Sequence, residues 1–217
     1  EIGVRLVGSE MCIRDSDNTI MNGETLEYMS ILLDSDIKHI MNNSIKESMS
    51  NVSSDLYENI TNNISYFKGL KYKDVEKICK NLPYTLNSAH TIKSLKQKGY
   101  IVICMSGGFE VAVKNTITDL DVDEIFCNYL HCKDGILTGN VGGCMLQYNS
   151  KGILLNKLQK LMNIKKEDTI AIGDGSNDIS MFKYAGKSIA FCASDIVKKN
   201  ADIIINERDL SLILKHI

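Results

Sequence analysis

The chain lacks the features that would place it in several large protein classes. Among its 217 residues no apolar run approaches the ~20 residues that a membrane-spanning helix needs. Its formal net charge of -2 gives no attraction to nucleic acid or to an anionic membrane surface. The seven cysteines are dispersed, odd in number and contain no C-x-x-C pair. We therefore predict a cytoplasmic protein with reduced thiols and with no membrane or nucleic-acid partner.

Arginine is also scarce, and its distribution is uneven. Only three arginines occur, and two of them, Arg5 and Arg14, lie within residues 1–16. The rest of the chain is rich in lysine, asparagine and isoleucine and contains Arg208 alone. We interpret residues 1–16 as a segment that resembles translated sequencing-adapter sequence. Residues 8–14 are in addition poor material for a buried central strand, because such strands are nearly continuous apolar runs.

The single proline, Pro83, closes a region that differs from the rest of the chain. Between residues 24 and 85 the apolar residues recur at helical spacing and no strand is convincing. After this region helices and short apolar strands alternate, with a hairpin turn expected at Asp134-Gly135. We expect helices at 87–98, 109–119 and 151–162, and strands at 100–105, 125–130, 169–172, 189–192 and 202–205. This alternation predicts an α/β fold, in which helices cover a parallel sheet.

The most informative stretch is Gly173-Asp174-Gly175-Ser176-Asn177-Asp178, which follows the apolar run 169–172. Two carboxylates and an amide lie on one strand-to-helix turn. Carboxylates at such short distances repel each other unless a cation lies between them. Oxygen ligands of this kind suit Mg²⁺, which usually accompanies phosphate chemistry. A dinucleotide fingerprint would need glycine at Asp178, and a calcium loop would need glycine at Ile179. A polar turn without chemistry is the third alternative.

Three further motifs indicate a catalytic site only when they are considered together. Asp15-Ser16-Asp17-Asn18-Thr19 contains an acidic pair at i and i+2, which on a strand end points to one side. Ser106-Gly107-Gly108-Phe109 follows a strand and offers backbone N–H groups to an anion. Lys151-Gly152 begins a helix. Taken alone, each has an ordinary alternative, namely a solvated turn, a tight turn and an exposed lysine.

In this order, D-S-D-N-T, S-G-G-F, K-G and G-D-G-S-N-D resemble the four motifs of the haloacid dehalogenase superfamily, and most closely its phosphoserine phosphatase branch. The resemblance runs from about Asp15 to Ile217. It implies a Rossmann-like parallel core formed by residues 1–23 and 86–217. Residues 24–85 would form a small helical cap domain inserted after the first motif.

The resemblance also implies a mechanism, which is Mg²⁺-dependent hydrolysis of a phosphomonoester through an aspartyl-phosphate. Asp15 would be the nucleophile, Asp17 the proton donor and then the base, and Thr19 would orient Asp17. The metal would be held by Asp15, the Asp17 carbonyl and Asp174, and Asp178 would orient its waters or Lys151. The transferring phosphoryl group would be bound by Ser106, the Gly107 N–H, Lys151 and Asn177.

The substrate implied is a small phosphorylated metabolite, with phosphoserine first and hence the last step of serine biosynthesis. Glu24 would read the amino group of serine, or it is simply a helix-start acid. Asn63, however, lies where the resemblance expects an arginine for the carboxylate, and an amide does not reproduce that bidentate grip. The alternatives are a relative that hydrolyses or transfers another small phosphate ester, and an inactive binding protein on the same scaffold. We expect a monomer or a homodimer.

Overall fold

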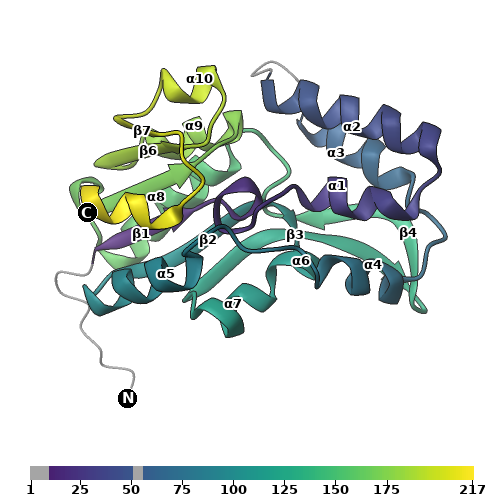
Figure 1. Cartoon of the computed structure of the whole chain (residues 1–217), viewed down its shortest axis with the longest axis horizontal. Coiled ribbons are helices and arrows are strands. Elements are labelled where there is room, and N and C mark those ends of the chain that lie inside the picture. The colour runs from purple at the N-terminus through teal and green to yellow at the C-terminus, as the bar shows by residue number, and fades with distance from the viewer. Residues whose placement is uncertain (1–9, 51–55) are drawn as a thin grey trace.

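One mixed sheet organises the structure (Figure 1). The computed structural model describes residues 10–50 and 56–217. In this part of the chain seven strands follow the order β4-β3-β2-β1-β5-β6-β7, and every neighbouring pair is parallel except the antiparallel β3–β4 hairpin. The strands are β1 (Met11–Arg14), β2 (Ile101–Phe109), β3 (Glu124–Lys133), β4 (Ile136–Gly143), β5 (Thr169–Gly173), β6 (Lys187–Phe191) and β7 (Ile203–Ile205).

Helices cover both faces of this sheet, which confirms the predicted α/β fold. On one face α8 (Ser150–Met162) and α9 (Ile179–Phe182) pack with Met11 and Ile13 of β1 into one apolar cluster. On the other face a larger cluster joins Cys12 of β1 to α5, α7 and the C-terminal 3₁₀ helix η5. The bounds of these and of the remaining short helices are α5 (Ser88–Gln97), α6 (Glu110–Val113), α7 (Asn115–Leu120), α10 (Asp195–Lys198) and η5 (Leu210–His216).

Two expectations about this region are refined by the structure. The helix expected at 109–119 is divided into α6 and α7, and β2 runs on to Phe109. The motif Ser106-Gly107-Gly108 therefore lies in the last part of a strand, where its register with β3 shifts between Met105 and Phe109. Glycines accommodate such an irregular strand end readily. The hairpin at Asp134-Gly135 is confirmed, and both residues have positive φ, at 52° and 79°.

The region inserted after β1 is helical, as predicted. It contains α1 (Thr25–Met29), α2 (Ser35–Ser50), α3 (Leu56–Ser65) and α4 (Tyr72–Cys79). The chain after α3 bonds to the β3–β4 hairpin, with Gly69 N donating to Leu137 O at 2.9 Å and Leu137 N to Leu70 O at 2.8 Å. Buried residues of α2 and α3 belong to the larger apolar cluster, which also contains Cys12 of β1. The division into a core and a cap domain stays a prediction.

Strand β1 forms at the centre of the sheet, between β2 and β5, and all four of its residues are buried. Met11, Cys12 and Ile13 fit that environment, because they are apolar. Arg14 does not, because it is completely buried and its Nε, Nη1 and Nη2 atoms have no hydrogen-bond partner. Within β1, the doubt that the sequence raised therefore concerns Arg14 alone, and residues 8 and 9 of the doubted segment lie outside the described residues. The adapter interpretation of residues 1–16 stays a prediction.

The structure bears on the state of the cysteines and on the presence of membrane-spanning helices. All seven cysteines are free, and three of them, Cys12, Cys79 and Cys104, are buried. Among the described residues no helix combines the length and the apolar character that crossing a bilayer requires. The cytoplasmic location stays a prediction.

Candidate active site

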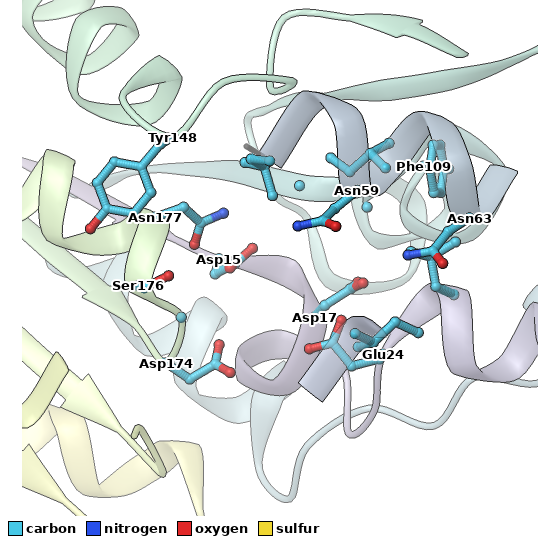
Figure 2. Close-up of a pocket in the computed structure, with 17 residues that line it drawn as sticks. Asp15, Asp17, Glu24, Asn59, Asn63, Phe109, Tyr148, Asp174, Ser176 and Asn177 are labelled. Carbon is cyan, nitrogen blue, oxygen red and sulfur yellow. The ribbon is translucent and has the colours of Figure 1, made fainter. Parts of the chain in front are cut away.

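The predicted site residues lie at and around the carboxyl ends of three neighbouring strands. Figure 2 shows Asp15, Asp17, Glu24, Asp174 and Asn177 around one pocket. Asp15 directly follows β1, and its N–H donates to Ile172 O of β5 at 3.0 Å. Asp174 directly follows β5, and Ser106 and Gly107 lie at the end of β2. Because β1 is flanked by β2 and β5, parallel pairing alone brings these three ends to one edge of the sheet.

Lys151, the second residue of α8, links two buried carboxylates. Its Nζ donates to Asp15 Oδ2 at 2.6 Å and to Asp178 Oδ1 at 2.5 Å. Burial alone would lower the pKa of Lys151, but the two carboxylates outweigh burial and raise it, so the side chain stays charged. The pKa of Asp15 rises to about 7, because burial outweighs the attraction of Lys151 and the charge of Asp178 adds to the rise. The negative charge of the buried carboxylates therefore exceeds the positive charge that Lys151 provides.

The turn after β5 is closed by Asp178. Its Oδ2 accepts hydrogen bonds from Asp174 N at 3.0 Å and from Gly175 N at 2.9 Å. A Cβ atom on Gly173 would lie 2.2 Å from Asp178 Cγ, so only glycine allows this approach. One oxygen of Asp178 thus accepts hydrogen bonds from the turn, and its other oxygen accepts one from Lys151. The bonds to the turn hold Asp174 at the strand end.

The arrangement fits a divalent cation with oxygen ligands. Carboxylate oxygens of Asp15, Asp174 and Asp178 lie within 4.8 Å of one another. Burial and the charges of Asp15 and Asp178 raise the pKa of Asp174 well above its usual value. A bound cation relieves this repulsion, and hard oxygen donors suit Mg²⁺. The predicted Mg²⁺ site therefore agrees with the donor set, and the ligand assignment stays a prediction.

Asp17 points into the same pocket but has a different partner from the one expected. Thr25 donates to it twice, from N to Oδ2 at 2.9 Å and from Oγ1 to Oδ1 at 2.8 Å. Burial raises the pKa of Asp17, and these two hydrogen bonds oppose that rise. Thr19, which we expected to orient Asp17, instead donates its Oγ1 to Asp174 Oδ1 at 3.4 Å. Thr19 is completely buried and is not among the residues lining the pocket.

Glu24 lies beside Asp17 on the pocket wall, next to the helical region. Its Oε1 accepts a hydrogen bond from Asn18 Nδ2 at 2.5 Å. Burial and the neighbouring charges of Asp17, Asp174 and Asp15 raise the pKa of Glu24 well above its usual value. Asn18 adopts the left-handed conformation, at φ 55°, which asparagine tolerates better than most residues. Glu24 therefore lines the pocket, and its predicted contact with the substrate stays a prediction.

The remaining predicted residues line the pocket or lie next to residues that line it. Gly107 and Asn177 line it, whereas Ser106 is completely buried and does not, and its Oγ accepts a hydrogen bond from Gly108 N at 3.0 Å. The inserted helices supply an upper wall, in which Asn59 and Asn63 from α3 face the carboxylates (Figure 2). The other lining residues on that side are Leu26, Ile45, Leu56 and Ile60.

Sequence reasoning missed three contributors. Thr25 carries no motif signal of its own and was overlooked beside Glu24. Asn128 holds the glycine-rich strand end, because its Nδ2 donates to Gly107 O at 2.9 Å and its Oδ1 accepts from Met145 N at 3.0 Å. A polar side chain inside the apolar run 125–130 was the signal that could have found it. Tyr148 lines the pocket near Asn177, and nothing in its sequence context indicated this.

Comparisons with known proteins identify relatives of this chain. Residues 139–217 match the family described as haloacid dehalogenase-like hydrolase. The chain is 42% identical over 208 residues to a phosphoserine phosphatase of Methanocaldococcus jannaschii, covering 96% of this chain and 97% of the relative. It is 36% identical to the phosphoserine phosphatase of Wolinella succinogenes, covering 96% of this chain and all of the relative.

Solved structures extend the likeness to three dimensions. One is described as the phospho-aspartyl intermediate analogue of a phosphoserine phosphatase, with a TM-score of 0.91, 41% identity and coverage of 97% of this chain and 100% of the other. A second is a substrate-bound phosphoserine phosphatase complex, with a TM-score of 0.91, 40% identity and coverage of 97% and 99%.

The family match, the relatives and the α/β sheet with helices on both faces place the chain among the haloacid dehalogenase-like hydrolases. Within that class, the chain belongs to the phosphoserine phosphatase family.

Proposed function

We propose that this chain hydrolyses O-phospho-L-serine to serine and phosphate, with Mg²⁺ as cofactor and an aspartyl-phosphate on Asp15 as intermediate. The observation that carries the proposal is the buried pair Asp15 and Asp17, which share one pocket with Asp174 while Lys151 bonds to Asp15. The identity to phosphoserine phosphatases over nearly the whole chain supports the substrate.

The two half-reactions use the same residues in turn. An Asp15 oxygen attacks phosphorus, the bond from phosphorus to the ester oxygen breaks, and Asp17 gives its proton to that leaving oxygen. Water then attacks the phosphorus of the aspartyl-phosphate and gives a proton to Asp17, and the bond between phosphorus and Asp15 breaks. Phosphate leaves, and both carboxyl groups return to their starting states.

Positive and hydrogen-bonding groups surround the path of the phosphoryl group. Lys151, the Gly107 N–H, Ser106 and Asn177 would neutralise its oxygens, since positioning and electrostatics supply most of the catalysis in phosphoryl transfer. Asp15, Asp174 and the Asp17 carbonyl would hold Mg²⁺, and Asp178 would keep Lys151 in place. When bound, the cation supplies charge stabilisation for the transferred group.

The direct test is phosphate release from L-phosphoserine and from a panel of other small phosphate esters. We expect release that depends on Mg²⁺, stops on chelation and is fastest with phosphoserine. A preference for another ester would keep the mechanism and would favour a related phosphatase or phosphotransferase. A folded protein that releases phosphate from no ester would contradict the proposal.

The pocket differs in one feature from what we would expect of a site that binds the carboxylate of phosphoserine. No lysine or arginine occurs among the described residues that line the pocket wall of the inserted helices. The sequence also contains no basic residue between Lys46 and Lys68, so the segment that follows α2 cannot add one. Asn63 is buried, and its Nδ2 donates to Ser44 Oγ at 3.3 Å. A substrate carboxylate would here meet amides rather than a cation.

Replacing Asn63 by arginine is therefore expected to lower KM for phosphoserine by about tenfold, because charge-assisted bonds to a carboxylate are stronger than amide bonds. The KM for phosphoethanolamine, which lacks the carboxylate, should not fall. The matched control is Asn62→Arg, on the same helix but exposed. Steady-state kinetics of both variants with both esters decide the matter, and an equal effect on the two esters would argue against carboxylate contact.

Removal of the metal should reveal the raised carboxyl pKa values. The folded state binds protons more tightly than the unfolded state, because the pKa of Asp15 rises from 3.8 to about 7 and those of Glu24 and Asp174 also rise. The stabilisation is thus present at low pH and is lost as the pH increases through that interval. We expect the Tm in a chelator to fall from about pH 5 to about pH 8.

Mg²⁺ should restore the Tm at the higher pH, because the cation takes the place of the protons. Thermal unfolding followed by circular dichroism at both pH values, with and without Mg²⁺, is the measurement. A metal-free protein whose Tm increases with pH would contradict the expected sign.

A further inference from the structure

We propose that Thr25 is the residue that positions the Asp17 carboxylate for proton transfer, so that helix α1 of the inserted region sets the direction of the general acid. This inference rests on the proposed function. Thr25 bonds to both oxygens of Asp17, from N to Oδ2 at 2.9 Å and from Oγ1 to Oδ1 at 2.8 Å. Two bonds from one residue fix both the tilt and the rotation of a carboxylate, which a single bond does not.

The neighbourhood leaves the Asp17–Thr25 pair little room to move. Thr25 is completely buried, and Asp17 is nearly so. Gly108 lies against both residues, because an added Cβ there would come within 2.9 and 3.0 Å of the Asp17 oxygens and within 3.0 Å of Thr25 Oγ1. The end of β2 therefore packs directly on the pair, and a side chain there would displace it. Three separate segments determine where the carboxylate points.

Thr25 also links this geometry to the substrate end of the pocket. It is the first residue of α1, and Glu24, which immediately precedes it, lines the pocket and bonds to Asn18. Helix α1 in turn packs against α4 and α2 of the inserted region. A shift of α1 would therefore move Glu24, which lines the pocket, and Thr25, which bonds to Asp17, at the same time.

The two bonds differ in what they permit chemically. A backbone N–H can only donate, whereas a hydroxyl can donate or accept. The hydroxyl bond to Oδ1 can therefore adapt when Asp17 carries a proton, while the N–H continues to hold Oδ2. The hydroxyl is the part of Thr25 that we expect proton transfer to depend on.

The test compares two esters that differ in their need for an acid. The serine alkoxide leaves well only if it is protonated, whereas p-nitrophenolate leaves without a proton. In Thr25→Val, which removes the hydroxyl and keeps the N–H, kcat/KM for phosphoserine should fall by about 10²-fold, within the usual contribution of a general acid. For p-nitrophenyl phosphate it should stay close to that of the wild type. Thr25→Ser, which keeps the hydroxyl, should recover most of the phosphoserine activity.

A purely structural effect is separated by a matched control. Thr116 is equally buried, and its Oγ1 donates to Val113 O at 2.7 Å, away from the pocket. Thr116→Val should lower the Tm without changing the ratio of the two kcat/KM values. The inference is overturned if Thr25→Val reduces both esters by the same factor or reduces neither. If the wild-type protein with Mg²⁺ hydrolyses neither ester, the proposed function itself has failed, whatever the variants do.

Discussion

Replacing Arg14 by leucine should make the protein more stable by roughly 3–5 kcal/mol, the scale of an uncompensated buried charge. Arg14 ends the central strand, its pairing partners Cys104 and Ile172 are completely buried, and both belong to the larger apolar cluster. Its three guanidinium nitrogens have no hydrogen-bond partner. Leucine would remove the charge from the core and fill the space with apolar atoms.

The measurement is thermal and denaturant unfolding of the wild type and of Arg14→Leu, and for a chain of this size the expected rise in Tm is on the order of 10 °C. Arg14→Lys is the matched control, because it keeps a buried charge and should give no gain. Unchanged or lower stability in Arg14→Leu would mean that the guanidinium is compensated in the folded protein.

The second large effect is expected at the nucleophile. Asp15→Asn should reduce phosphate release from phosphoserine by about 10⁴-fold or more, the scale of removing an enzymatic nucleophile. An amide cannot form the acyl phosphate, but it retains an oxygen for the bond that Ser16 N donates to Asp15 Oδ1, at 2.6 Å. The change is therefore small in shape and large in chemistry.

A neutralised carboxylate elsewhere serves as the control. Asp36 is exposed at the start of α2, and Asp36→Asn should keep full activity. Circular dichroism of Asp15→Asn should show an intact fold, so that lost activity is not lost structure. Turnover comparable to that of the wild type in Asp15→Asn would mean that water or another residue attacks phosphorus directly.

Much of the fold followed from the sequence because the signals are local. The hairpin at Asp134-Gly135 needs only residues that tolerate positive φ. The convergence of Asp15, Ser106 and Asp174 needs only that parallel strands end at one edge, and the structure places them there. Lys151 could be assigned to the site only because the resemblance to the family's motifs implied a lysine there.

The rest depended on contacts between segments that no local pattern encodes. Thr25 meets Asp17 because of how the chain turns between them, with Asn18 in the left-handed conformation. The bonds of Gly69 and Leu70 to Leu137 join the helical insert to a hairpin far along the chain, and only packing decides that. The burial of Arg14 followed from pairing on both sides, which overrode the unsuitability of its side chain.

During turnover we expect a phosphoryl group to be bound covalently to Asp15. The most direct measurement is to quench the Mg²⁺-loaded enzyme in acid during hydrolysis of phosphoserine, reduce it with borohydride and map the peptides by mass spectrometry. Borohydride converts an aspartyl-phosphate to homoserine, so we predict homoserine at position 15 alone, dependent on substrate and absent from Asp15→Asn. Homoserine at another aspartate, or none in an enzyme that is turning over, would contradict this account.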